Sequence, residues 1–377
     1  MLPGLRVAHR LLLIYMLSFA AVAYLAYTLV AEKNIAIHFT RKERHGIAYA
    51  DVVRQSLLSM IEIREAARLQ PGDHNGDYTS LEERITALAA AEREYGHNLD
   101  TAALADGLQA DMRQLVAREE SDPAARGLLE ARAVDTARQL ITRIGDQSNL
   151  ILDPYLDSYY TMSVVMLRLP EAVTDATDLA DEALAVNLPR ADSNESRVRF
   201  LLKEGAFNAT IAGLTSDIDA AFRGNADGKL RRNLEPTLLR TENAVHGYSR
   251  GLRSMAIEHL SADANSPAVH VMLRQVLGAM DDLWREADIE LKRLLQQRID
   301  DFYHRMAVDL GMAALVWLAS LGFILVVARQ ITGPIRELSH VAQRIRYGAD
   351  YSLRARYRAG GEVRQLIDGF NTMLDRL

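Results

Sequence analysis

The sequence predicts an all-α protein with two transmembrane helices, a large helical bundle between them and a helical segment after the second. Two apolar stretches, Leu11–Val30 and Leu310–Ala328, carry no charge. At about 1.5 Å per residue, each spans the hydrocarbon core of a bilayer. Aromatic residues are only 6% of the chain, while Ala, Leu and Arg are abundant, which favours long helices. No alternation of Val, Ile and Thr is long enough for a strand.

Basic residues orient the two spans. They precede the first span and follow the second: Arg6, Arg10, Arg329, Arg336, Arg344 and Arg346. By the positive-inside rule, both termini are expected in the cytoplasm. The first span is longer than the apolar core of a signal peptide and is expected to stay uncleaved. The expected segments are a cytoplasmic N-terminus (1–10), a first membrane helix (11–31), an outer helical domain (32–305), a second membrane helix (306–328) and a cytoplasmic helical segment (329–377).

Charge and residue types exclude several functions. Residues 32–305 carry 33 Lys and Arg against 44 Asp and Glu, while residues 329–377 carry 9 against 5. The acidic outer domain argues against nucleic acid as a partner. The chain has no cysteine and its ten histidines do not cluster, so neither a disulfide nor a metal site is expected. No phosphate-binding loop, nucleophile elbow or kinase signature occurs, so we expect no cofactor and no catalytic residue in this chain.

Turn residues divide the outer domain into helices. The first continues from the membrane span to about Leu69 and ends at the loop Gln70–Thr79. Ser80 and Glu83 then predict a capping box for a helix that is interrupted near Gly96 and ends near Glu119. Asp-Pro pairs predict helix starts at 122–123 and 153–154. Further helices are expected at about 195–223, 229–259 and from 267 into the second span.

The two spans impose a condition on these helices. Because the chain leaves and re-enters the same membrane face, the number of long traverses must be even. Counting every break as a reversal gives seven, which is odd. At least one break is therefore expected to be a kink. Asp153-Pro154 is the candidate for this kink. Residues 123–186 would then form one long bent helix, and the outer domain would consist of two stacked helical bundles. The break at Gly96–Asp100 is the alternative.

Two heptad seams joined by a connector follow the second span. Pro334 is expected near the start of the first helix. Apolar residues there are spaced by 4, 3, 4 and 3 positions: Ile331, Ile335, Leu338, Ala342 and Ile345. The connector, Tyr347–Gly360, contains Gly348 and Leu353. The second helix carries a seam of Val363, Leu366, Phe370, Met373 and Leu377.

This segment resembles a HAMP domain, the relay of bacterial transmembrane receptors. The resemblance rests on Pro334, Gly348, Glu362 and Phe370-Asn371-x-Met373. The sequence departs from the usual pattern at Gly361 and Arg364, where Asp and Gly are common. The resemblance implies a homodimer with a parallel four-helix HAMP bundle. The expected relay residues are Pro334, Gly348, Leu353, Glu362, Leu366, Phe370 and Met373.

The second helix of this segment offers two registers. Leu366 and Met373 complete one seam, whereas Ile367 and Leu374 complete another. Adjacent residues on a helix point about 100° apart, so a modest axial rotation could exchange the seams, as a bistable relay requires. The alternative is a wide apolar face in a static bundle.

The most distinctive outer stretch is Asn149–Pro170. It resembles a segment in the helical ligand-binding regions of bacterial chemoreceptors, sensor kinases and diguanylate cyclases, with matches at Asp153, Pro154, Leu156, Asp157, Ser158, Tyr159, Tyr160, Leu169 and Pro170. Glu43-x-x-Gly46-x-x-Tyr49 is similar to the first helix of that family. Asp153, Asp157, Tyr159 and Tyr160 are candidate ligand-binding residues. The alternative is that Asp153 caps a helix and the tyrosine hydroxyls satisfy buried backbone groups.

Two arginines near the far end of the first outer helix form a second candidate site. Arg64 and Arg68 are four residues apart, so both guanidinium groups lie on one helix face and could clamp a carboxylate ligand. The alternative is a solvated face paired with Glu62 or Glu65.

These features predict a transmembrane receptor of the bacterial inner membrane. It would sense a small molecule or a periplasmic binding protein outside the cytoplasm and relay the signal through the HAMP domain. The chain ends in mid-heptad, so we expect an output domain beyond it. The resemblance allows a histidine kinase, a diguanylate cyclase or a chemoreceptor tail, and the connector and the Phe370-Asn371-x-Met373 ending favour the first two. The alternative is a complete membrane-anchored interaction protein whose HAMP-like helices only dimerise or dock a partner.

Overall fold

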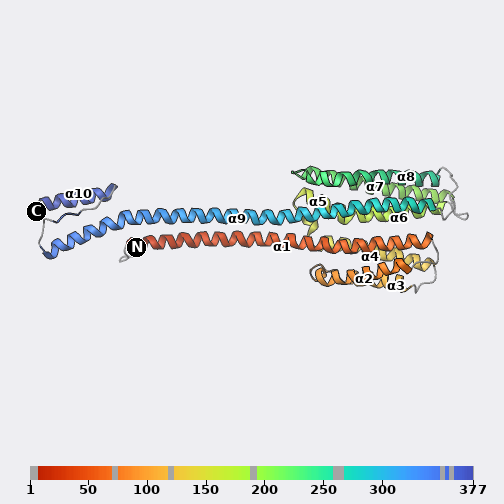
Figure 1. Ribbon diagram of the computed structural model, residues 1–377, viewed down its shortest axis with the longest axis horizontal. Coiled ribbons are helices and arrows are strands. Elements are labelled where there is room, and N and C mark those ends of the chain that lie inside the picture. Colours follow the sequence, from red (N-terminus) through yellow and green to blue (C-terminus); the bar gives the residue numbers. More distant parts are fainter. Residues whose placement is uncertain are drawn as a thin grey trace. The chain divides into compact units, whose positions relative to one another are not determined.

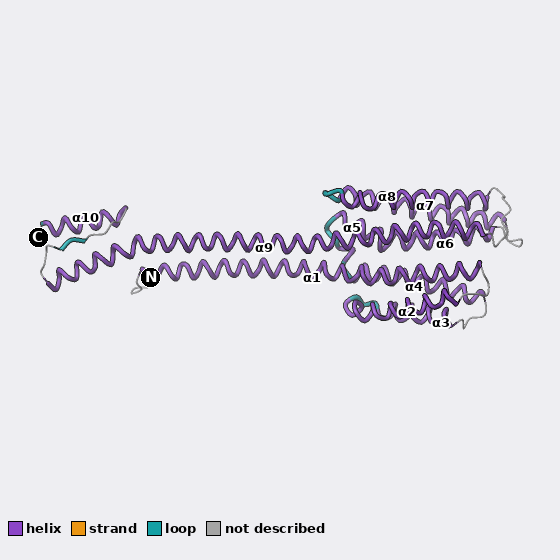
Figure 2. Tube along the Cα trace, viewed as in Figure 1, coloured by secondary structure: helices purple, strands orange, loops and turns teal. Residues whose placement is uncertain are grey.

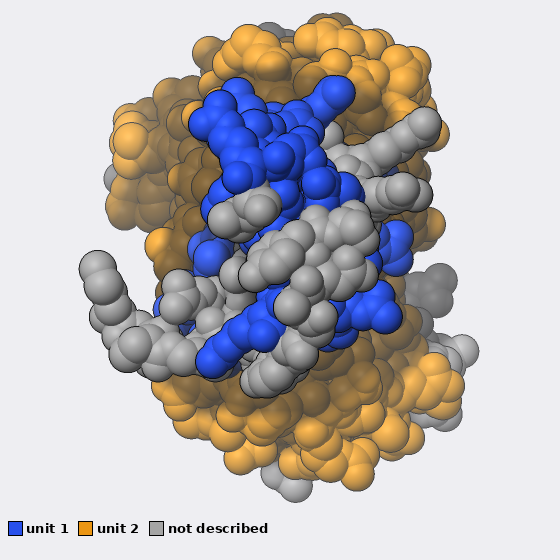
Figure 3. Space-filling view, turned by 90° about the vertical axis from the view of Figure 1, so that its left-hand side faces the viewer, with its two compact units in different colours: residues 1–36, 301–377 blue, residues 37–300 orange. Residues whose placement is uncertain are grey.

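The computed structural model describes residues 7–69, 75–117, 123–186, 193–257, 267–348, 353–355 and 361–376. Every regular element in these ranges is helical and none is a strand, which confirms the predicted all-α class. The chain divides into two compact units, coloured separately in Figure 3. Residues 1–36 and 301–377 form one, which we call the relay unit, and residues 37–300 form the other, the bundle unit.

The helices are labelled in Figure 1. In chain order they are α1 (Val7–Leu69), α2 (Asn75–Tyr95), α3 (Ala102–Ala117), α4 (Pro123–Gln147), α5 (Leu156–Ser163), α6 (Leu169–Val186), α7 (Ser193–Gly224), α8 (Lys229–Ile257), α9 (Pro267–Gly348) and α10 (Gly361–Asp375). Short turns of 3₁₀-helix occur at Gly96–Asn98 and Leu150–Leu152, and a π-helical turn at Val164–Arg168 joins α5 to α6. Helix α2 begins before Ser80, so the capping box predicted at Ser80 and Glu83 is wrong.

The bundle unit contains two four-helix bundles that lie side by side (Figures 1 and 2). The outer portion of α1 packs with α2, α3 and α4, and the outer portion of α9 packs with α6, α7 and α8. Helices α1 and α9 run antiparallel within the unit, because Glu43 pairs with Arg298 and Glu65 pairs with His270. The predicted modules are therefore side by side and not stacked.

The chain reverses at Asp153-Pro154, so the predicted bent helix over residues 123–186 is wrong. Residues 131–138 of α4 line one cavity with residues 174–178 of α6, and residues 142–146 line another hollow with residues 166–171. This pairing makes α4 and α6 antiparallel. The chain also reverses at Gly96–Asp100, since α2 packs on α3. With α5 and α6 taken as one pass, the described helices make an even number of passes, so no kink is required.

Apolar residues at helical spacing hold the bundles together. On α4, Ala133, Ala137, Leu140 and Ile144 repeat at intervals of 4, 3 and 4, and all four are fully buried. Burying each large aliphatic side chain contributes about 1.5–3 kcal/mol. Trp284 of α9 is the largest fully buried side chain. One continuous core cluster includes residues from α1, α4, α6 and α9, which makes the two bundles a single packed body.

The relay unit contains the two predicted spans. Helices α1 and α9 each include an uncharged window that is long and apolar enough to cross a membrane, and none of either window is buried by protein. Leu17 and Phe323 are 75% and 71% exposed. Apolar exposure of this extent fits a lipid-facing surface. Tyr15 stacks on Trp317 with ring centroids 5.4 Å apart, so the two windows contact each other inside the relay unit.

Candidate functional site: the junction of α1, α5 and α9

The reversal before α5 is built around Asp153. Asn149 has φ 68°, a left-handed conformation that Asn tolerates better than most residues. Leu150–Leu152 then form a 3₁₀ turn, and Asp153 is extended. One Asp153 carboxylate oxygen, Oδ1, accepts a hydrogen bond from the backbone N–H of Tyr155 at 2.9 Å. Asp153 thus supports the start of α5, as the capping interpretation proposed, although the residue at the N-cap is Tyr155.

Asp153 also binds Arg298 of α9, a contact that the sequence did not indicate. Arg298 Nη2 donates to both carboxylate oxygens of Asp153 at 2.9 Å and to the hydroxyl of Ser158. Nη1 lies 3.4 Å from Oε2 of Glu43, and the guanidinium carbon sits 4.3 Å from the ring centroid of Tyr155. We call these five residues the junction cluster, because they join α1, α5 and α9.

The ionisable side chains of the junction cluster, two carboxyl groups and one guanidinium group, are buried, whereas Tyr155 is exposed. The side chains of Glu43 and Asp153 are 0% exposed and that of Arg298 is 9% exposed. Burial raises the pKa of the Glu43 carboxyl to about 8, with Arg298 opposing and Asp153 reinforcing that shift. Glu43 Oε1 has no hydrogen-bond partner among the described residues. At neutral pH, Glu43 is therefore mostly protonated and Arg298 with Asp153 forms a neutral pair.

The two stretches that resemble the helical sensor family meet at this junction. Glu43 and Gly46 belong to the first stretch, and Asp153 and Ser158 to the second. Gly46 packs against the side chain of Ser148, leaving no room for a Cβ atom. The resemblance therefore maps onto one contact region. Arg298 completes it from a position 145 residues away in the sequence, so no local pattern could have revealed it.

The other candidates in this stretch hold helices together. Asp157 Oδ2 accepts a hydrogen bond from Asn225 Nδ2 at 3.1 Å, which ties α5 to the end of α7. Tyr159 and Tyr160 are half-buried against the core, with ring centroids 5.2 Å apart in an edge-on arrangement. Neither tyrosine belongs to the junction cluster.

Of the two arginines predicted to clamp a carboxylate, Arg64 can be placed in the structure. Arg64 lies 3.4 Å from Glu65 and 3.5 Å from Asp181, which supports the ion-pair alternative in part. It also lines a cavity of about 210 Å³ between α1, α4 and α6. Arg68 belongs to α1, but its side chain lies outside the described portion of the structure. The predicted pair therefore has one described member.

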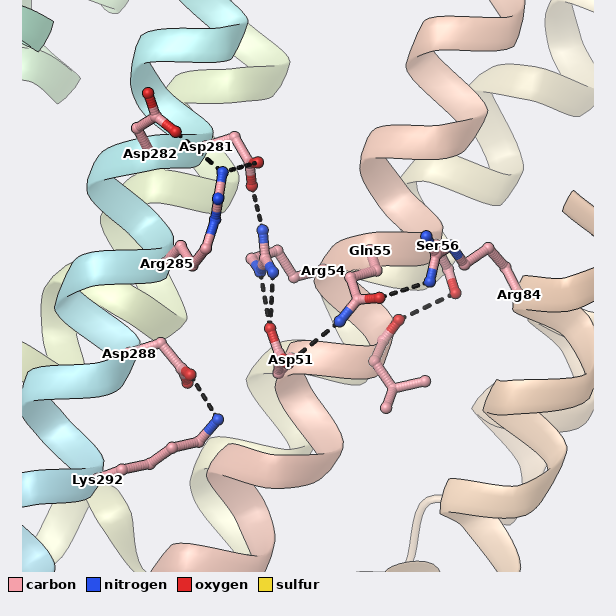
Figure 4. A network of polar contacts seen from close by, with 11 residues as sticks. Asp51, Arg54, Gln55, Ser56, Arg84, Asp281, Asp282, Arg285, Asp288 and Lys292 are labelled. Carbon is pink, nitrogen blue, oxygen red and sulfur yellow. Dashed lines mark hydrogen bonds and ion pairs between the residues drawn. The ribbon is translucent and has the colours of Figure 1, made fainter. Parts of the chain in front are cut away.

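A second polar network joins α1 to α9 further along α1 (Figure 4). Arg54 of α1 donates to Asp51 at 2.8 and 3.0 Å and also bonds Asp281 of α9. Its side chain is 7% exposed. Arg285 of α9 pairs with the same Asp281 at 3.1 Å. Sequence analysis missed this network, which fixes the register between α1 and α9.

The HAMP segment folds its second helix onto its first through a small apolar cluster. Val341, Ala355 and Ile367 are buried, and Leu338, Ile345, Leu353, Val363 and Phe370 pack against them. Leu353 and Phe370, both predicted relay residues, are half-buried against this cluster. Asn371 accepts from the backbone N–H of Ala355 at 3.0 Å and donates to its carbonyl at 3.1 Å, which holds the connector to α10.

Helix α10 buries one of the two predicted registers. Ile367 and Leu374 are each 4% exposed, whereas Leu366 and Met373 are 57% and 50% exposed. Glu362 is exposed in the first turn of α10. Within a single chain, the seam is therefore the Ile367–Leu374 register, and the predicted relay residues Leu366 and Met373 form an apolar strip on the surface.

Two other relay residues lie on α9. Pro334 is inside this helix and not near its start, because the first HAMP helix continues directly from the span without a break. The cost of a proline inside a helix is the loss of one backbone hydrogen bond and a clash with the preceding turn. Gly348 is the last residue of α9, where a glycine commonly ends a helix.

Comparison with known proteins agrees with the C-terminal assignment. The HAMP domain family matches residues 326–377, which confirms a HAMP domain at the C-terminal end. A HAMP domain indicates a signal-relay receptor of the bacterial type. No curated protein and no solved structure matches the chain. Among the described residues, no group of three His, Cys, Asp or Glu side chains is arranged to hold a metal ion.

Proposed function

We propose that this chain is the sensing and relay portion of a homodimeric receptor in the bacterial inner membrane. The observation that carries the proposal is the order of segments on α9. The helix passes from the bundle through an uncharged apolar window and into the matched HAMP domain. A helix of this kind suits transmission of a packing change to an output module, for which a histidine kinase or a diguanylate cyclase is the candidate.

The bundle unit is the proposed input. A ligand or periplasmic binding protein would have to bind one packing of the bundles more tightly than another, because only differential affinity shifts an equilibrium. The junction cluster is the proposed transmission point, since α1 and α9 both continue from it toward the membrane windows. A change in the reversal before α5 would then alter how α1 packs against α9.

The exposed strip on α10 supports the homodimer. Leu366 and Met373 are large apolar residues on the surface of the single chain. In a parallel dimer they would pack against the partner, which completes a four-helix bundle. Lipid would cover the membrane windows.

Topology is the test of this proposal. Alkaline phosphatase, which is active only outside the cytoplasm, should be active when fused after residue 180 and inactive when fused after residue 360. Green fluorescent protein at the same two positions should give the opposite pattern and controls for expression. A phosphatase active at residue 360 and inactive at residue 180 would overturn the receptor proposal.

A further inference from the structure

The cavity beside Arg64 is the best-built ligand site in the described portion of the bundle unit. It has a volume of about 210 Å³ and lies where α1, α4 and α6 meet. Its polar lining consists of Arg64, Arg138, Asp135, Asp178, Thr174 and Thr177. Pockets for drug-sized ligands are about 300–1,000 Å³, so this one fits only a molecule of a few carbon atoms.

The buried guanidinium group of Arg64 makes ion pairs but no hydrogen bond through Nε and Nη2 with any described residue. The nearest carboxylates, Glu65 and Asp181, lie at ion-pair distances of 3.4 and 3.5 Å. The other Glu65 oxygen is bonded to His270 at 2.8 Å. Buried polar groups without a partner are uncommon, and the planar guanidinium matches a ligand carboxylate.

Other residues of the lining supply acceptors. Thr174 and Thr177 donate their hydroxyl hydrogens to the carbonyls of Pro170 and Val173 at 2.9 and 2.8 Å. Their oxygen lone pairs are therefore the groups offered to a ligand. Asp135 and Asp178 each accept one hydrogen bond at 2.7 Å, from Gln139 and Lys203. Acceptors of this kind suit an ammonium group.

We propose that this cavity binds a small α-amino acid as its zwitterion. The ligand carboxylate contacts Arg64 and Arg138, and its ammonium group contacts the carboxylates and threonine hydroxyls. The two arginines and two aspartates lining the cavity sum to zero formal charge, so a zwitterion adds no net charge to the site, whereas a simple anion or amine does. This inference rests on the proposed receptor function and names its ligand class.

The position of the cavity connects binding to the bundle interface. Helices α1 and α4 belong to one bundle and α6 belongs to the other. A ligand held by Arg64 on one side and Thr174 or Asp178 on the other bridges both bundles. Because α1 continues toward the first membrane window, the bridge favours one packing of α1 against its neighbours.

Calorimetric titration of the full chain in detergent micelles tests the site. Glycine, L-alanine, L-serine and L-valine are the probes, with propionate and ethylamine as the two halves of alanine. We expect saturable binding of at least one amino acid, and binding at least tenfold weaker for both half-molecules. Propionate binding as tight as alanine binding would overturn the zwitterion assignment, and so would no binding by any of the four amino acids.

Variants locate the binding. Arg64→Gln and Asp135→Asn should each weaken binding roughly tenfold, the loss expected for one charge-assisted hydrogen bond. Circular dichroism shows whether each variant is folded. Asp135 is exposed, so Asp135→Asn is expected to fold and still tests the site if Arg64→Gln does not fold. Arg143→Gln is the matched control, because Arg143 lines the neighbouring hollow and pairs with exposed Asp100 at 3.2 Å. Unchanged binding in Asp135→Asn, or equal loss in Arg143→Gln, would overturn the site.

Failure of this inference is distinguishable from failure of the receptor proposal. A chain with the expected fusion topology that binds none of the probes loses the ligand assignment and keeps the receptor function. A reversed topology removes the receptor function whatever the titrations give.

Discussion

The guanidinium of Arg298 holds both carboxylate oxygens of Asp153 at 2.9 Å in a buried site. This one contact connects the long helix α9 to the reversal that starts α5. If Asp153 only capped a helix, its replacement by Ala would cost about 1 kcal/mol. The observed ion pair makes the expected cost larger, because Arg298 would be left buried without its main partner.

We predict that Asp153→Ala lowers the free energy of unfolding by about 3–5 kcal/mol, the range for breaking a buried ion pair. Thermal unfolding of the full chain in detergent, followed by far-ultraviolet circular dichroism, measures the change. Glu235→Ala is the control, because Glu235 forms an exposed pair with Arg231 and such pairs contribute about 0–1 kcal/mol. A cost for Asp153→Ala no larger than the control's would contradict the role of Arg298.

The raised pKa of the buried Glu43 carboxyl predicts a specific dependence of folding stability on pH. Burial raises its folded-state pKa from 4.5 to about 8, so the unfolded chain releases this proton at lower pH than the folded chain does. The stabilisation from Glu43 is fully present below pH 4.5 and is lost as pH rises to about 8. One proton gives a slope of up to about 1.4 kcal/mol per pH unit.

Glu43→Gln removes the titrating group while keeping the shape of the side chain. The variant should lose less stability than the parent between pH 5 and pH 8, by on the order of a few kcal/mol. Unfolding temperatures of both proteins across that range provide the comparison, with Glu235→Gln as an exposed control. The same pH profile in parent and Glu43→Gln would refute the assignment.

The Arg54 network offers a matched pair of neighbouring aspartates. Asp281 bonds buried Arg54 and also pairs with Arg285, whereas Asp282 pairs with exposed Arg285 at 2.9 Å. Asp281→Asn should therefore destabilise the protein by about 1–3 kcal/mol, and Asp282→Asn by less than about 1 kcal/mol. Thermal unfolding of both variants tests this ranking, and an equal effect would show that the network does not fix α1 against α9.

Crosslinking tests the dimer at α10. The chain has no cysteine, so single cysteines report one position at a time. In membranes, Leu366→Cys and Met373→Cys should form disulfide-linked dimers under mild oxidation, because these side chains are exposed and apolar. Asp368→Cys, on the opposite face of the helix, should not.

The two-register hypothesis adds a second expectation. Ile367 and Leu374 are buried within the single chain, so cysteines there should crosslink poorly in this state. If α10 rotates during signalling, replacing Leu374 by Ser should increase the crosslinking of Ile367→Cys relative to that of Leu366→Cys. An unchanged crosslinking pattern would favour a static bundle with a wide apolar face.

The sequence by itself determined the local features of this protein. Uncharged stretches such as Leu310–Ala328 need only their own composition to be suited to a membrane. Heptad spacing directly after a membrane span, together with Pro334, Gly348, Glu362 and Phe370-Asn371-x-Met373, identified the HAMP segment. The helix starts at Pro123 and Pro267 also followed from local chemistry, since proline is favoured in the first turn of a helix.

Only the tertiary structure decided how these helices pack and which charges meet. The Asp153-Pro154 break has the same local signal whether it bends or reverses a helix, and the antiparallel packing of α4 on α6 selects the reversal. Arg298 reaches Asp153 across 145 residues, a separation that leaves no periodic trace in the sequence. The choice of Ile367 over Leu366 depends on Val341 and Ala355 packing against α10, because two overlapping apolar registers are equivalent until a neighbouring surface buries one of them.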